Sequence, residues 1–136
     1  MIVDDEALIR AGLRAILNFG HTVGHALEAI SGYGKYLHGE AISIGQVAAA
    51  RLTNVFTGLP ADEATRVENA FTQAGLPTTV RLKKHDFTRL ARAMQLDKKV
   101  SGGDVRFVLA RRIGEVVWGQ KVSIEDVIKI LHGCGK

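Results

Sequence analysis

The fold is decided by residues 18–40, NFGHTVGHALEAISGYGKYLHGE. His21 and His25 are four residues apart, so on a helix their side chains lie on one face, one turn from each other. A glycine-containing turn follows, and His38 stands at the beginning of a second helical pattern. The stretch therefore predicts two consecutive helices that can bring histidines from separate elements to one point.

Histidines at this spacing have two interpretations. Paired helix histidines are often exposed or hydrogen-bonded to carbonyl groups, but imidazole is also a frequent zinc ligand. A catalytic zinc site typically takes three protein ligands and leaves one position open. Glu28, Glu40 or a carboxylate from elsewhere could be the third ligand, or could orient a ligand histidine through a hydrogen bond. The residues alone leave these alternatives open.

Extended to LNFGHTVGHALEAISGYGKYLHGEA, the same stretch resembles the metal-binding signature of the 3-dehydroquinate synthase family. The similarity continues through AISIGQVAAA, AGLP and LDKKVSGGDVRFVL into the last helix, so residues 11–136 match the family's C-terminal metal- and substrate-binding domain. Residues 1–10 are an atypical leader, because their acidic residues lie further from the GLR motif than in the family. The resemblance implies that residues 1–136 form a single helical domain, a fragment of a two-domain enzyme.

The resemblance also implies roles for individual residues. The family's two zinc-binding histidines correspond to His21 and His38. The family's substrate-site residues correspond to Arg14, Asn18, His25 and Lys98. Arg14 and Asn18 would point the same way as His21 if the helix is continuous through Gly20. The third zinc ligand of the family, a glutamate, lies upstream of the matched segment, and none of the acidic residues at positions 4–6 stands in its place.

Enzymes of this family convert 3-deoxy-arabino-heptulosonate 7-phosphate to 3-dehydroquinate and phosphate, in the shikimate pathway of aromatic amino acid biosynthesis. The resemblance therefore implies a carbon–oxygen lyase that uses Zn²⁺ (or Co²⁺) and NAD, with NAD held by an N-terminal domain absent from this sequence. We expect a phosphorylated sugar acid as the small-molecule substrate and a cytoplasmic location. The chain could form a homodimer through the apolar surface that would otherwise meet the other domain. Alone, we expect it to show no turnover and to bind zinc weakly.

Composition bounds the class of protein. A chain of 136 residues, 46% hydrophobic and 24% charged, is long enough for one soluble globular domain with its own core. No apolar run reaches the roughly 18 residues of a membrane span, so no membrane partner is expected. The net charge of +4 suits an anionic substrate but is also ordinary surface chemistry. The single Cys134 cannot form an internal disulfide, which is compatible with a reducing compartment.

The rest of the chain predicts further helices and one hairpin. Helical patterns cover residues 6–17, 41–58, 62–73, 86–96 and 124–131, and β-rich segments cover 105–110 and 115–118. Asp62 and Ser123 are expected to cap their helices. The fold class is therefore mainly α, a multi-helical domain of about five helices with one small β-hairpin. The alternation of strands and helices that a nucleotide-binding sheet requires is missing.

Small and apolar residues indicate how the helices pack. Gly20 and Gly24 share a four-residue spacing, which lets another backbone or a ligand approach closely. Gly45 and the alanines at 48–50 predict close packing of the second helix against the first. The core-facing side of the helix at 86–96 is expected to consist of Phe87, Leu90, Ala91 and Met94. His85 and His132 are expected on the surface.

Other interpretations compete with the family assignment. Lys98 and Lys99 precede a glycine-rich turn and fit a solvated loop, whereas the resemblance favours a phosphate or carboxylate contact at Lys98. Another sugar-phosphate cyclase or a metal-dependent polyol dehydrogenase would share the histidine-bearing helical domain. An alternative of a different class is a non-catalytic helical module that binds nucleic acid through scattered basic pairs. No recognition helix stands out, so we expect no nucleic acid partner.

Overall fold

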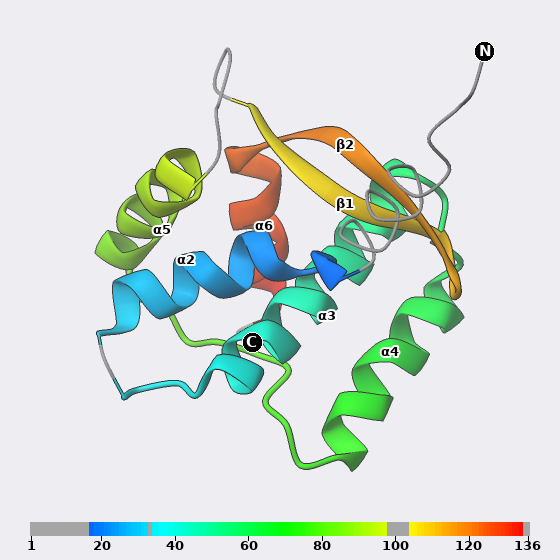
Figure 1. Ribbon diagram of the computed structural model, residues 1–136, viewed down its shortest axis with the longest axis horizontal. Coiled ribbons are helices and arrows are strands. Elements are labelled where there is room, and N and C mark those ends of the chain that lie inside the picture. The colour runs from blue at the N-terminus through cyan, green and yellow to red at the C-terminus, as the bar shows by residue number, and fades with distance from the viewer. Residues whose placement is uncertain (1–16, 33, 98–103, 135–136) are drawn as a thin grey trace, which may run out of the picture.

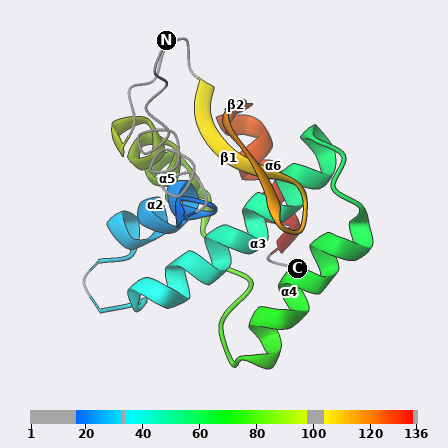
Figure 2. The same cartoon turned by 45° about the vertical axis from the view of Figure 1, so that its right-hand side comes forward.

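Helix α3 is the central element of the structure, a computed structural model that describes residues 17–32, 34–97 and 104–134. The elements are, in chain order, α2 (His21–Ser31), α3 (His38–Phe56), α4 (Ala61–Gln73), α5 (Lys84–Asp97), β1 (Asp104–Arg112), β2 (Glu115–Ser123) and α6 (Ile124–Cys134). Figures 1 and 2 show α3 running through the middle, with α2 and α5 on one side and α4 on the other. Five helices and one two-stranded antiparallel sheet in the described part confirm the expected mainly α class.

The close approach of α2 and α3 depends on glycines. A Cβ added at Gly45 of α3 would overlap the carbonyl oxygen of Gly20, and one added at Gly24 of α2 would lie 2.7 Å from Cδ1 of Ile42. Gly20 has a φ of 79°, a left-handed conformation that glycine adopts without steric cost. The spacing of the glycines thus serves the approach of another backbone, and the packing predicted from Gly45 is confirmed.

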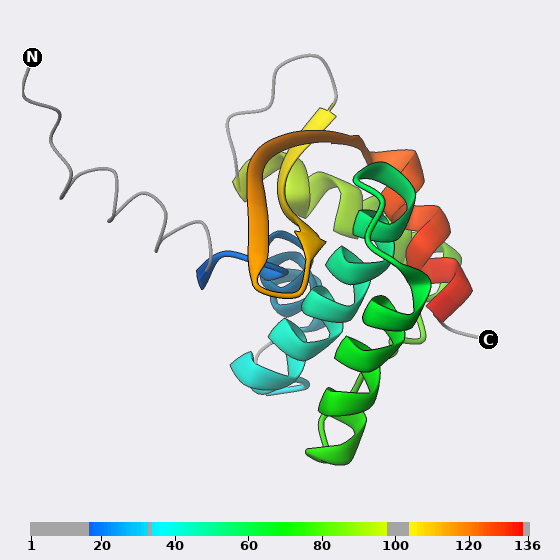
Figure 3. The same cartoon turned by 90° about the vertical axis from the view of Figure 1, so that its right-hand side faces the viewer.

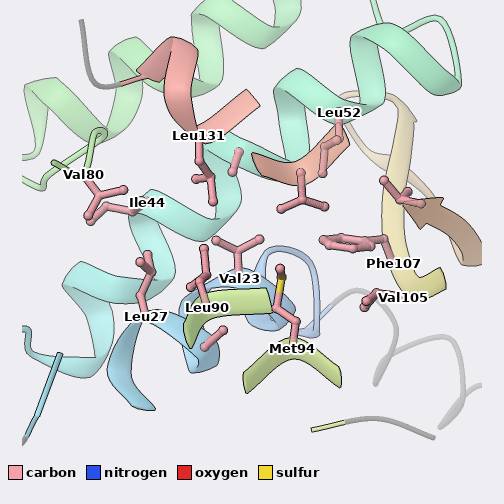
Figure 4. Packing of buried hydrophobic residues seen from close by; sticks show 14 of the residues in the cluster. Val23, Leu27, Ile44, Leu52, Val80, Leu90, Met94, Val105, Phe107 and Leu131 are labelled. Carbon is pink, nitrogen blue, oxygen red and sulfur yellow. The ribbon is translucent and has the colours of Figure 1, made fainter. Parts of the chain in front are cut away.

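The hydrophobic core lies where α2, α3, α5, α6 and the hairpin meet (Figure 4). Leu27 of α2, Leu90 and Met94 of α5 and Phe107 of β1 are almost completely buried in it. Burial of a side chain of this size contributes roughly 1.5–3 kcal/mol relative to exposure. The predicted inward face of α5 is confirmed at Phe87, Leu90 and Met94, and Ala91 is half-buried.

The β-hairpin lies across the helices (Figure 3). Two threonines, Thr53 in α3 and Thr57 at its C-cap, join the hairpin to this helix. The ladder between β1 and β2 has irregularities between Phe107 and Leu109 and between Ala110 and Arg112. At the second irregularity, the Ala110 amide donates to Thr53 Oγ1 at 3.1 Å, and the Ala110 carbonyl accepts from Thr57 Oγ1 at 2.7 Å. Two side chains one helical turn apart therefore bind both backbone groups of one strand residue.

The helix starts agree only in part with the sequence expectations. Ser123 caps α6 as predicted, because its Oγ accepts a hydrogen bond from the Asp126 amide at 3.2 Å. The prediction for Asp62 was wrong: Pro60 is the N-cap residue of α4, and Asp62 lies in the first turn. Proline at 60 already fixes a φ of −55°, and the Asp62 carboxylate acts instead on the positive end of the helix dipole. Helix α5 begins at Lys84, before the expected residue 86.

Several expectations lie outside the described residues. The helix expected at 6–17 falls there except for its last residue, as do the leader at 1–10 and the glycine-rich turn at 101–103. Both strands are longer than expected, since β2 continues to Ser123 and leads directly into α6. His85 and His132 are exposed as predicted, and the His132 ring stacks on Phe87 with centroids 4.1 Å apart. Within the described ranges, every helix is too short or too polar to cross a membrane.

Candidate metal centre

Three histidines from two helices converge between one face of α2 and the start of α3. His21 and His25 lie one turn apart on α2, and His38 is the first residue of α3. The ring centroids of His21 and His25 are 5.2 Å apart, and the His38 ring lies 6.1 Å from the first and 5.9 Å from the second. His21 and His25 are half-buried and His38 is exposed. The convergence expected from the spacing of residues 18–40 is therefore present.

Glu28 stands among the histidines. It lies three residues after His25 on α2, so both side chains project from the same face. Its two carboxylate oxygens are 3.1 and 3.2 Å from Nδ1 of His38. Ligand atoms of His25, Glu28 and His38 all lie within 4.8 Å of one another, and nitrogen and oxygen donors of this kind bind zinc. The cluster therefore fits a divalent metal.

Glu40, the other nearby carboxylate considered from the sequence, has a different position. Its Oε2 accepts a hydrogen bond from the Leu37 amide at 2.9 Å and so satisfies a free donor at the start of α3. Glu28, and not Glu40, belongs to the histidine cluster. The three-residue spacing between His25 and Glu28, which places both side chains on one helix face, was the sequence signal that could have favoured Glu28 over Glu40.

His21 has a partner that sequence reasoning missed. Its Nδ1 lies 3.4 Å from the carbonyl oxygen of Phe19, two residues earlier. This carbonyl points at the ring because the chain turns sharply over Asn18–Gly20 before α2 begins, with the His21 amide donating to the Asn18 carbonyl at 3.0 Å. A backbone conformation of this kind leaves no pattern in the sequence except the glycine itself.

The expected substrate residues are placed only in part. His25 lies inside the cluster, and Asn18 is exposed in the turn that precedes α2. Arg14 and Lys98 lie outside the described residues. The condition that a continuous helix aligns Arg14, Asn18 and His21 is not met, because the left-handed Gly20 interrupts the helix and α2 begins at His21.

An apolar hollow of about 510 Å³ lies elsewhere, between α3, α4 and the tip of the hairpin. Phe19, Leu59, Phe71 and Val116 are among the residues that line it, and none of the three histidines does. The hollow and the histidine cluster are therefore separate features of the surface.

Residues 1–100 match the family model described as 3-dehydroquinate synthase C-terminal. The chain belongs to the 3-dehydroquinate synthase family. The 3-dehydroquinate synthase of Synechococcus sp. is 45% identical over 133 residues, which are 97% of this chain and 35% of that protein. The enzyme of Bordetella pertussis is 47% identical over 107 residues, 79% of this chain and 29% of that protein. The chain thus spans about a third of the length of these curated relatives.

Solved structures of two cyclases share the fold with this member of the 3-dehydroquinate synthase family. One is 2-deoxy-scyllo-inosose synthase complexed with carbaglucose-6-phosphate, NAD⁺ and Co²⁺, with a TM-score of 0.76, 22% identity, and coverage of 88% of this chain and 35% of that one. The other is 2-epi-5-epi-valiolone synthase from Streptomyces hygroscopicus with NAD⁺ and Zn²⁺ bound, with a TM-score of 0.73, 23% identity, and coverage of 86% and 32%. At these identities the likeness establishes the fold, and the family resemblance predicted from residues 18–40 is confirmed by the family model.

Proposed function

We propose that this chain is the metal- and substrate-binding portion of a 3-dehydroquinate synthase, a phosphate-eliminating carbon–oxygen lyase of the shikimate pathway. The observation that carries the proposal is the convergence of His21, His25 and His38 in a chain that belongs to this family. In the proposal, residues 1–136 form one helical domain, and the upstream part of the complete enzyme binds NAD. The enzyme acts in the cytoplasm on a phosphorylated sugar acid.

In this proposal His21 and His38 hold Zn²⁺ or Co²⁺ through neutral imidazole nitrogens. The rings come from two packed helices and lie 6.1 Å apart, so one ion can lie between them. When bound, the metal supplies Lewis-acid stabilisation of negative charge on a substrate oxygen. The Zn²⁺ and Co²⁺ in the structurally similar cyclases are consistent with this choice of metal.

The remaining expected residues bind the substrate. His25 stands beside the two proposed ligands and contacts a polar or phosphate group of the substrate. The Asn18 amide, exposed in the turn before α2, hydrogen-bonds a hydroxyl group. Arg14 and Lys98 meet the substrate's anionic groups, for which guanidinium and ammonium groups are suited. These four residues orient the substrate against the ion.

Metal titrations of single-histidine variants test the assignment. At saturating Co²⁺ we expect the chain to bind one equivalent of the ion weakly, followed by its visible spectrum, and we expect His38→Ala and His21→Ala to lose this binding. His25→Ala should retain it, because His25 is assigned to the substrate. His85→Ala is the matched control, since His85 is an exposed histidine of α5 that pairs with Asp86. Stoichiometric binding by His38→Ala, or its loss in His25→Ala with retention in His21→Ala, would contradict the assignment.

A second candidate function is another sugar-phosphate cyclase. The fold similarity to 2-deoxy-scyllo-inosose synthase favours it, but the identity to that protein is 22%, against 45% to the dehydroquinate synthase of Synechococcus sp.. The two candidates differ in substrate, so a complete enzyme that carries this chain as its C-terminal part should form 3-dehydroquinate and not a cyclitol. Detection of inositol-like products would favour the alternative.

A further inference from the structure

Each of the two proposed metal ligands has an oxygen acceptor next to its Nδ1, and this acceptor determines which ring nitrogen is protonated. Nδ1 of His38 lies 3.1 and 3.2 Å from the oxygens of Glu28, and Nδ1 of His21 lies 3.4 Å from the carbonyl of Phe19. A carbonyl oxygen and an ionised carboxylate can only accept a hydrogen bond. In both neutral rings the proton must therefore be on Nδ1, which leaves the lone pair of Nε2 free to bind a cation.

We infer that Glu28 is a positioning residue that fixes the tautomer and orientation of His38, so that Nε2 of this ring faces the metal. The inference deepens the proposed function and rests on it for the metal. Metal-ligating histidines usually donate their other N–H to a carboxylate or a backbone carbonyl, which orients the ring and raises its basicity. Glu28 supplies the carboxylate for His38, and Phe19 supplies the carbonyl for His21.

His38 needs such a partner more than His21 does. The side chain of His38 is 61% exposed at the first residue of α3, where little packing restricts its ring, whereas that of Glu28 is 32% exposed. Glu28 projects from α2 next to the fully buried Leu27. The Glu28 carboxylate is therefore the more restricted of the two side chains, and its hydrogen bond fixes the more exposed His38 ring on the next helix.

The alternative role for Glu28 is that of a direct ligand, as its place in the cluster would also allow. The two roles differ in the nitrogen that they require. A positioning Glu28 holds Nδ1–H and leaves the metal to Nε2, whereas a carboxylate that shared the ion with the adjacent Nδ1 would need this nitrogen deprotonated. Both oxygens lie within hydrogen-bonding distance of Nδ1, so either can accept its N–H group as the positioning role requires.

The tautomer can be measured in the metal-free chain. Long-range ¹H–¹⁵N correlation spectra at pH 8 distinguish Nδ1–H from Nε2–H, and the spectrum of His38→Ala assigns the signals of residue 38. We expect Nδ1–H in the unsubstituted chain and a shift toward Nε2–H in Glu28→Ala. Glu28→Gln should keep much of the Nδ1–H form, since its amide oxygen still accepts a hydrogen bond.

Glu40→Gln is the matched control. It removes the same charge two residues from His38, but Glu40 contacts the Leu37 amide, and glutamine also serves in a capping box. We expect the tautomer of His38 to be unchanged in this variant. An Nε2–H tautomer in the unsubstituted chain would overturn the inference. So would an unchanged Nδ1–H tautomer in Glu28→Ala.

Metal affinity separates this inference from the proposed function. Loss of an orienting partner lowers metal affinity typically 10–100-fold, so Glu28→Ala should bind Co²⁺ more weakly by this factor, with a smaller loss in Glu28→Gln. If Glu28→Ala abolishes binding as completely as His38→Ala, Glu28 is a ligand and the positioning role is wrong. If the tautomer depends on Glu28 but the unsubstituted chain binds no Co²⁺, the proposed metal function fails while the contact that fixes the tautomer is supported.

Discussion

Gly45 lies where α3 packs closely against the start of α2. A Cβ at this position would overlap the Gly20 carbonyl, which is backbone and cannot move as a flexible side chain would. We expect Gly45→Ala to lower the free energy of unfolding by about 1–3 kcal/mol, as measured by urea denaturation. Gly39→Ala is the control, because a Cβ there meets no atom within 4 Å. It should be neutral or up to about 1 kcal/mol stabilising, and a similar loss in both variants would contradict the role of Gly45.

Thr53 carries a second prediction at the scale of one residue. It is fully buried, donates to the Ala49 carbonyl at 2.7 Å and accepts from the Ala110 amide. Thr53→Val keeps the shape but leaves this amide unsatisfied, so unfolding should require about 1–3 kcal/mol less. Thr65→Val, which removes an exposed hydroxyl bonded to the Ala61 carbonyl, should change stability by less than about 0.5 kcal/mol.

At the scale of single elements, the start of α6 depends on the Ser123–Asp126 pair. The Ser123 hydroxyl donates to the Asp126 carboxylate at 2.7 Å, and this hydrogen bond lowers the pKa of Asp126 from its ordinary value of 3.8. A lowered pKa in the folded state means that the contribution to stability is complete above about pH 3.8 and is lost as the pH falls toward the lower folded value. The carboxylate therefore stabilises the folded chain only where it is ionised.

We expect the difference in unfolding free energy between the unsubstituted chain and Asp126→Asn to be constant near neutral pH and to shrink below about pH 4. Urea denaturation at a series of pH values measures it. Asp86→Asn should behave in the same way, because the backbone hydrogen bond from Lys83 lowers the pKa of Asp86. A difference that grows as the pH falls would show that the sign of the linkage is wrong.

The elements also show how far the sequence could predict the structure. Helix α6 and the hairpin were predictable because their apolar periods and the capping serine act locally. The start of α4 was not, since Pro60 and Asp62 both favour a helix start and the sequence does not rank them. At the candidate site, the spacing of the histidines predicted their convergence. The sequence could not select Glu28 among the candidate carboxylates, because its contact with His38 depends on how α2 packs on α3.

At the scale of the whole molecule, the proposed function makes the described residues one half of a reaction centre. The only sheet in the described part has two antiparallel strands. Dinucleotides in α/β proteins bind at the carboxyl ends of parallel strands, where the strand order reverses. The structurally similar cyclases hold NAD⁺, yet this chain matches about a third of each. Under the proposed function, the histidine cluster would hold the metal and the substrate, and NAD would be bound by a part of the enzyme other than the described residues.

We accordingly expect the purified 136-residue chain, supplied with Zn²⁺, NAD⁺ and 3-deoxy-arabino-heptulosonate 7-phosphate, to form no detectable 3-dehydroquinate or phosphate. Its metal affinity should also be weak, because two histidines provide fewer ligands than the three of a typical catalytic zinc site. The complete synthase of Synechococcus sp., assayed alongside, is the control for substrate and conditions. Product formed by the chain alone would show that it binds NAD in a way that the described fold does not suggest. It would also refute the view that the histidine cluster acts only together with a separate dinucleotide site.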